Sequence, residues 1–103
     1  MIRKAKVTDI KSIQKLINYY AKRDKMLPRS LNELYENIRD FFVYAEGAKV
    51  YGCCALHIDW EDLSEIKSLA VAPAIAGKGI GKKLLEECVK EARDLKIKKI
   101  FAV

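Results

Sequence analysis

The apolar residues of this chain recur with two different periods, which divide it into expected strands and helices. Residues 2–7 alternate between apolar and basic side chains, the pattern of a half-buried strand. Either Thr8 or Asp9 then suits a helix N-cap, because short polar side chains accept hydrogen bonds from the first turn. The apolar residues that follow at helical spacing are Ile10, Ile13, Leu16, Ile17 and Tyr20. We expect a first strand and a first helix.

A second helix is expected after an interruption at residues 25–30. Pro28 disfavours helical geometry at Leu27, the residue that precedes it. Ser30, followed three residues later by Glu33, forms the capping-box pattern of a helix start. The apolar residues that continue this helix are Leu31, Leu34, Tyr35 and Ile38.

Two apolar stretches then predict a β-hairpin. FFVYAE (41–46) and KVYGCCALHID (49–59) are separated by the turn Glu46–Gly47–Ala48. WEDLS (60–64) is polar and is expected to connect the hairpin to the next strand.

The remaining residues predict a strand, a helix and a strand. EIKSLAVAP (65–73) ends at a proline, residues 79–95 have the apolar stripe of an amphipathic helix, and KKIFAV (98–103) is the last strand. Strands joined through a helix run parallel. The order β-α-α-β-β-β-α-β predicts an α/β (α+β) fold with a mixed sheet, and 103 residues favour one domain over 1–103.

The amino-acid composition favours certain classes of binding partner but does not select one of them. Twenty Lys and Arg against 14 Asp and Glu give a net charge of +6, which favours nucleic acid, anionic lipid or a small polyphosphate. Ion-paired surfaces of heat-adapted proteins have a similar composition. No apolar run is long enough to cross a membrane and no secretory signal is visible, so we expect a cytoplasmic protein.

The cysteines and the histidine predict no metal site. Cys53 and Cys54 are adjacent, so a strand would point them to opposite faces, and Cys88 lies in the expected helix. No CxxC spacing occurs, and the chain has a single histidine. We expect reduced, mostly buried thiols.

The stretch VAPAIAGKGIGKKLLEEC (71–88) is the clearest candidate for chemistry. It matches neither the P-loop nor the dinucleotide pattern, because Lys82 stands where each would need a glycine. It does join a strand to a helix, where free N–H groups and the helix dipole favour an anion. Glycines at 77, 79 and 81 would let a phosphate approach the main chain, with Lys78, Lys82 and Lys83 adding charge. The alternative is a tight strand-to-helix turn with no ligand.

This stretch resembles the acetyl-CoA loop of the GNAT superfamily of N-acetyltransferases. Val71-x-Pro73 is followed by AGKGIGKKLL, in which Gly79 and Gly81 fill the small positions of the family's [QR]-x-x-G-x-[GA] pattern. Ala76 departs from the pattern's Arg or Gln. The resemblance implies a GNAT-like sheet and acetyl-CoA as cosubstrate, with main-chain contacts to pantetheine and then to pyrophosphate. The residues that it implies for this role are Leu69, Ala70, Val71, Gly77, Lys78, Gly79, Ile80, Gly81 and Lys82.

A narrower resemblance covers nearly the whole chain. MLPRSLNELYENIRDFFV (26–43), GCCAL (52–56) and EIKSLAV (65–71) are similar to the acetyltransferase domain of bacterial N-acetylglutamate synthases. These enzymes acetylate the α-amine of L-glutamate in arginine biosynthesis. The resemblance implies Glu65 as the general base, and substrate contacts by Leu27, Arg29 and Ser68.

Without the resemblance, the same residues also fit structural or solvent-exposed roles that involve no substrate. Arg29 suits a carboxylate, because its guanidinium donates two parallel hydrogen bonds, but it also fits a solvated side chain ahead of a helix. Glu65 is one of four acids in DWEDLSE and fits a surface charge. His57 is either a structural histidine or a contact to a substrate carboxylate.

Family members continue past the strand at 98–103, so we expect a chain that lacks the usual C-terminal helix and strands. The general acid is then expected beyond Val103, and the apolar edge of that last strand favours a homodimer.

Two alternative functions remain, acetylation of another amine (a protein N-terminus or a small metabolite) and a basic nucleic-acid-binding module. Aromatic residues are not interleaved with basic ones, which disfavours the second.

Overall fold

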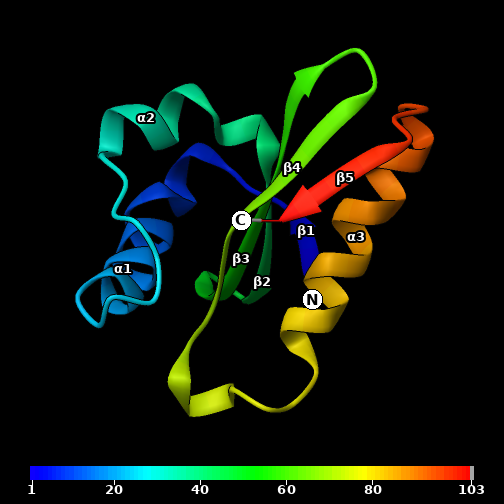
Figure 1. Ribbon diagram of the computed structural model, residues 1–103. Coiled ribbons are helices and arrows are strands. Elements are labelled where there is room, and N and C mark those ends of the chain that lie inside the picture. Colours follow the sequence, from blue (N-terminus) through cyan, green and yellow to red (C-terminus); the bar gives the residue numbers. More distant parts are fainter. Residues whose placement is uncertain (103) are drawn as a thin grey trace.

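The computed structural model describes residues 1–102, which form one five-stranded sheet with helices on both faces (Figure 1). The helices are α1 (Ile10–Ala21), α2 (Leu31–Glu36) and α3 (Ile80–Asp94), and the 3₁₀ turns are η1 (Val7–Asp9), η2 (Ile38–Asp40) and η3 (Pro73–Ile75). The strands are β1 (Ile2–Lys4), β2 (Phe41–Glu46), β3 (Lys49–Trp60), β4 (Leu63–Val71) and β5 (Lys99–Ala102). No helix within residues 1–102 is long and apolar enough to cross a bilayer.

The sheet follows the chain order β1-β2-β3-β4-β5. The first four strands pair in antiparallel fashion, and β5 pairs with β4 in parallel. The expected hairpin of β2 and β3 and the expected parallel pair around α3 are therefore confirmed. The fold is the mixed α/β architecture that the sequence predicts.

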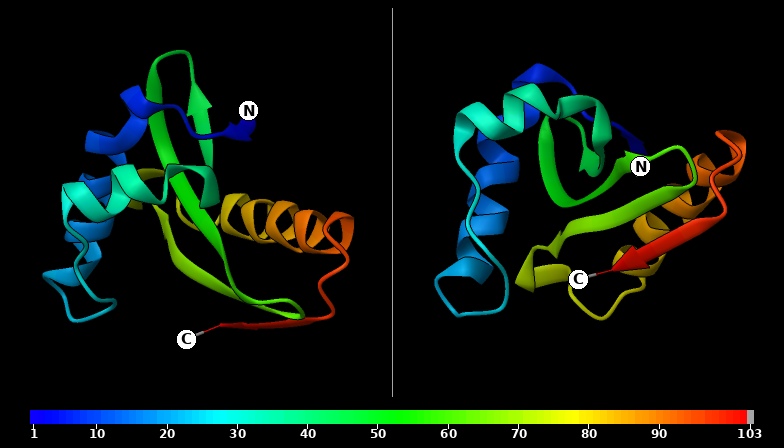
Figure 2. Two further views of the ribbon diagram at one scale, coloured as in Figure 1. Left: turned by 90° about the horizontal axis from the view of Figure 1, so that it is seen from above. Right: turned by 45° about the horizontal axis from the view of Figure 1, so that its top comes forward.

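The helices form two layers around the sheet, with α1 and α2 on one face and α3 on the other (Figure 2). The α1 and α2 face buries an apolar cluster that includes Ile13, Ile17, Phe41 and Cys53. The α3 face buries a second cluster that includes Cys54, Leu56, Ile66, Leu84 and Cys88. Adjacent strand residues point to opposite faces. Cys53 and Cys54 therefore belong to different cores, and the three cysteines are free and buried as expected.

Ser30 caps α2 as predicted, because its hydroxyl accepts a hydrogen bond from the Glu33 N–H at 3.1 Å. The first strand, predicted over residues 2–7, was predicted too long. The first strand ends at Lys4, and Val7 lies in η1. The Asp9 carboxylate accepts the Lys6 N–H at 2.7 Å, which closes this turn instead of capping α1.

The expected WEDLS connection was also too long. β3 runs to Trp60 and β4 begins at Leu63, so only Glu61 and Asp62 link them. Trp60 pairs with Leu63, and Ile58 pairs with Ser64, because antiparallel strands can continue to a very short turn. Glu65 therefore lies within β4 rather than at its start.

Candidate functional site

A β-bulge in β4 shapes the centre of the candidate site. The partners are Cys53 with Ala70 and Ala55 with Lys67, so β4 holds one residue more than β3 between these pairs. Ser68 lies in this bulge with a φ of +55°, a left-handed conformation that is uncommon for serine. The extra residue reverses the alternation of side chains, because a shift of one residue changes the face of a strand.

The bulge sorts the side chains of β4. Ile66, ahead of the bulge, packs in the α3-side cluster, so Glu65 and Lys67 point to the α1 and α2 face. Ala70, beyond the bulge, packs in the α1-side cluster. Regular alternation would have placed it with Ile66.

β4 and β5 are paired over only part of their length. The pairing runs from Leu63 with Lys99 to Ile66 with Ala102. Within residues 1–102, no strand pairs with the outer edge of residues 68–71. The residues predicted for pantetheine, Leu69, Ala70 and Val71, therefore lie on an open strand edge whose main chain can receive an extended ligand.

Two side chains brace this segment from the α1 face. The Tyr20 hydroxyl donates a hydrogen bond to the Val71 carbonyl, and the Cys53 thiol donates to the Ser68 carbonyl at 3.3 Å. Burial raises the pKa of the Cys53 thiol to about 12, so it remains protonated at neutral pH. Cys53 therefore supports the bulge and does not offer a thiolate nucleophile.

The glycine-rich loop exposes the start of α3. Gly77 and Gly79 have φ values of +83° and +81°, and a Cβ added at either would meet nothing within 4 Å. Gly79 occupies the N-cap with no side-chain cap, and the first helical hydrogen bond runs from the Lys83 N–H to the Gly79 carbonyl at 3.1 Å. The N–H groups of residues 80–82 precede that bond and have no partner within α3. This arrangement fits an anion in contact with the main chain.

Gly81 differs from the other two glycines, which sequence reasoning had grouped together. Its added Cβ would lie 3.6 Å from the Val71 side chain, in ordinary contact and facing β4 rather than solvent. Gly81 thus serves the approach of α3 to β4. The side chains of Lys78, Lys82 and Lys83 are exposed around the loop.

The structure brings Arg29 and Ser68 together although they are 39 residues apart. Arg29 Nη1 donates to Ser68 Oγ at 3.1 Å, and Arg29 Nε lies 3.4 Å from the Glu33 carboxylate. The guanidinium also lies 5.4 Å from the centre of the Phe41 ring. Its side chain is only 10% exposed, which overturns the interpretation of Arg29 as a solvated residue. Leu27, the third residue predicted to contact the substrate, is by contrast 83% exposed.

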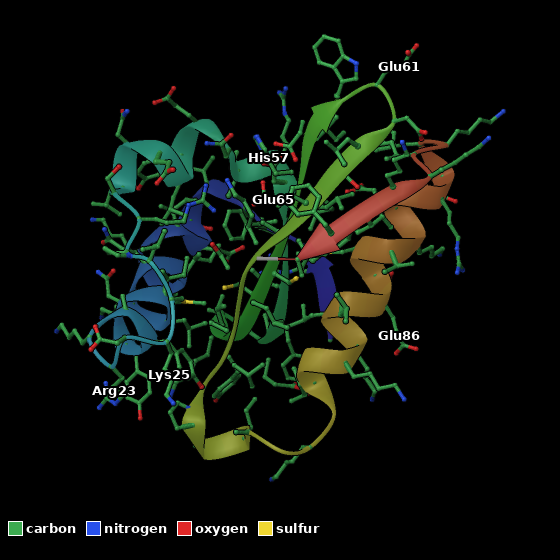
Figure 3. All side chains as sticks on the ribbon, in the orientation of Figure 1. Arg23, Lys25, His57, Glu61, Glu65 and Glu86 are labelled. Carbon is green, nitrogen blue, oxygen red and sulfur yellow. The ribbon has the colours of Figure 1, made fainter. Side chains whose placement is uncertain are left out.

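Glu65 lies on the same face of the sheet. Its side chain is 13% exposed, and its Oε1 is 3.8 Å from Lys67 Nζ, so it is not a solvated surface charge. Directly opposite on β3 lies His57, the register partner of Glu65. Figure 3 shows these two side chains next to each other between α2 and β5.

Sequence reasoning missed the residues that support this group. His57 Nδ1 lies 2.8 Å from Asp40 Oδ2, which connects η2 to β3, and nothing in the sequence pattern singled out Asp40. Tyr20 was expected only as an apolar residue of α1. In residues 1–102, no three His, Cys, Asp or Glu side chains gather in a way that could hold a metal ion.

Comparison with known proteins identifies the family that this chain matches. The model of the acetyltransferase (GNAT) family matches residues 7–103. An amino-acid acetyltransferase of Mycobacterium tuberculosis is 37% identical over 106 residues, which cover 100% of this chain and 60% of that protein.

Solved structures agree with the sequence comparison. A Mycobacterium tuberculosis protein in complex with CoA and a second ligand has a TM-score of 0.93 at 37% identity, over 99% of this chain and 63% of that one. N-acetylglutamate synthase from Neisseria gonorrhoeae, complexed with coenzyme A and N-acetyl-glutamate, has a TM-score of 0.94 at 34% identity. That match covers 99% of this chain and 24% of the synthase, so the chain spans less than two thirds of each of these relatives. Because the family match covers nearly all of its residues, the chain belongs to the GNAT acetyltransferase family.

Proposed function

We propose that this chain binds acetyl-CoA and transfers its acetyl group to the α-amine of L-glutamate. The observation that carries the proposal is the group formed by Arg29, Ser68 and Glu65 on one face of the sheet, beside the open edge of β4. The relatives of known structure named above bind CoA, and one also binds N-acetyl-glutamate.

The cofactor side of the site is built from main chain. The edge of residues 68–71 would receive the pantetheine arm, and the N–H groups at the start of α3 would receive the pyrophosphate. Gly77 and Gly79 leave open space where side chains would otherwise stand, so a phosphate fits close to the backbone. Acetyl-CoA supplies the acetyl group as a thioester.

The acceptor side is built from side chains. Arg29 would bind a substrate carboxylate through its guanidinium, since Ser68 and Glu33 already fix the orientation of that group. Glu65 would remove a proton from the substrate ammonium, leaving a lone pair to attack the thioester carbon. As the new C–N bond forms, main-chain N–H groups near Leu69 would stabilise the charge on the carbonyl oxygen. The C–S bond then breaks, and CoA leaves as a thiolate that takes up the proton lost by the new amide nitrogen.

An assay of free thiol tests the proposal. Acetyl-CoA is supplied with a panel of amines: L-glutamate, L-glutamine, D-glutamate, a neutral amino acid and a short peptide. We expect L-glutamate to give the fastest release of CoA. A faster reaction with another amine would replace glutamate as the acceptor and leave acetyl transfer standing. Absence of thiol release with every amine would overturn the transferase proposal.

A further inference from the structure

His57 is placed to act on the proposed base from the neighbouring strand. It is the register partner of Glu65, and both side chains lie on the α1 and α2 face of the sheet. Directly opposite residues in an antiparallel pair have Cβ atoms about 5 Å apart, so one water molecule can link a carboxylate on one strand to an imidazole on the other. Figure 3 shows the two side chains close to each other between α2 and β5.

Asp40 fixes which ring nitrogen of His57 carries the proton. Its Oδ2 lies 2.8 Å from Nδ1, and an ionised carboxylate can only accept a hydrogen bond. Nδ1 therefore donates, and the lone pair of the neutral ring lies on Nε2. Nε2 is 4.0 Å from Asp59 Oδ1, which is too far for a hydrogen bond.

Exposure gives the two residues different access to water. The Glu65 side chain is 13% exposed, whereas that of His57 is 34% exposed. A base that accepts a proton in each turnover must release it before the next one. Glu65 is poorly placed to release it directly to solvent, and its neighbour is better placed.

We infer that His57, oriented by Asp40, receives the proton that Glu65 has taken up and so returns the Glu65 carboxylate to its ionised state. The inference rests on the proposed function, because it takes Glu65 as the base. The O–H bond of protonated Glu65 breaks as its proton passes to a bridging water, that water gives a proton to the Nε2 lone pair of His57, and an imidazolium held by Asp40 and Asp59 results. That Nε2 proton then passes to water or buffer, while the Nδ1 proton stays on the ring. No oxidant or further reactant is needed.

The charged groups around the ring come from three elements. Asp40 belongs to η2, Asp59 to β3, and Glu65 and Lys67 to β4. Three carboxylates and one ammonium therefore lie on the elements that surround His57.

Nuclear magnetic resonance tests the arrangement without any activity. The chain has one histidine, so long-range ¹H–¹⁵N spectra contain signals from one imidazole. We expect the neutral ring to carry its proton on Nδ1, and Asp40→Asn to weaken that preference. Glu65→Gln should move the imidazole ¹⁵N signals, whereas Glu86→Gln, an exposed change on α3, should leave them in place. A ring protonated on Nε2, or signals indifferent to Glu65→Gln, would overturn the inference.

Kinetics test the role in turnover, with the amine that the native protein accepts best. We expect His57→Gln to lower kcat about tenfold with little change in either KM, a smaller loss than removal of the base itself. Added imidazole or a higher concentration of buffer base should restore the rate of His57→Gln and leave the native protein unaffected.

A merely structural histidine would give a loss that no added base reverses, and that result would contradict the inference. Failure of the proposed function looks different, because native protein and His57→Gln would then both release no thiol. In that case the imidazole signals still decide whether His57 and Glu65 are coupled.

Discussion

The two halves of the candidate site are built in opposite ways. On the cofactor side, the groups that would contact a ligand are main-chain atoms, exposed because β4 and β5 separate and because Gly79 starts α3 without a side-chain cap. On the acceptor side, the groups are side chains of Arg29, Ser68 and Glu65, fixed by contacts with their neighbours. One half depends on backbone conformation and the other on side-chain identity.

This difference predicts how each half tolerates change. A main-chain site is insensitive to most substitutions that preserve its φ and ψ angles, but it fails when a glycine with a positive φ is replaced. A side-chain site fails when one functional group is replaced, even where the backbone is untouched. Four substitutions test this contrast.

Glu65→Gln removes the proposed base and retains the size of the side chain. We expect kcat to fall by about a hundredfold or more, since a positioned base contributes 10²–10⁴-fold, while CoA binding stays unchanged. Glu86→Gln on the exposed surface of α3 is the matched control and should behave as the native protein. Thiol release and calorimetry with CoA measure the two quantities. A loss of CoA binding in Glu65→Gln would contradict the claim that the cofactor side and the acceptor side depend on separate groups.

Gly79→Val tests the main-chain half. A non-glycine residue in the left-handed region costs roughly 1–2 kcal/mol, so the loop should leave its present conformation and CoA should bind about tenfold more weakly. Lys83→Ala removes one exposed charge from the same loop and should change the affinity far less. Equal losses by calorimetry would mean that side-chain charge, not the main chain, holds the cofactor.

Arg29→Lys tests the side-chain half at constant charge. The lysine cannot donate two parallel hydrogen bonds to a carboxylate, so KM for glutamate should rise about tenfold while affinity for CoA is retained. Arg23→Lys is the control, because Arg23 is an exposed residue just beyond α1 whose guanidinium lies over the Tyr19 ring. If both affinities fall together in Arg29→Lys, the residue supports the fold rather than the substrate.

Asp9→Asn changes stability and leaves both halves intact. Arg3 donates to Asp9 at 2.7 Å and 3.1 Å, and this hydrogen bonding lowers the pKa of the buried carboxyl. The unfolded chain binds the proton more tightly, so the ion pair stabilises the fold above the unfolded pKa of about 4. That contribution disappears as the pH falls through the lower pKa of the folded state.

Urea unfolding measures the predicted change. At pH 7 we expect Asp9→Asn to lower the free energy of unfolding by roughly 2 kcal/mol, with native KM values. The difference should shrink as the pH falls below about 4. A difference that is constant with pH would show that the charge of Asp9 contributes nothing.

Much of the fold could be predicted from local pattern. The helical stripe of α1, the Ser30 cap of α2 and the hairpin of β2 and β3 are encoded by residues close together in sequence, so periodicity and capping rules found them. The end of β1 and the start of β4 were wrong. Each depends on a partner outside the predicted strand: the Asp9 carboxylate in one case and the cross-strand pairs with β3 in the other.

The glycine-rich loop could also be predicted from the sequence, because a left-handed backbone favours glycine and glycines stand at 77 and 79. The rest of the site depends on contacts between residues that are distant in sequence. The bulge at Ser68 arises from pairing with β3, the contact of Arg29 with Ser68 spans 39 residues, and Asp40 meets His57 across 17. No local pattern records such contacts, because they form only when packing of the helices against the sheet brings distant segments to one face.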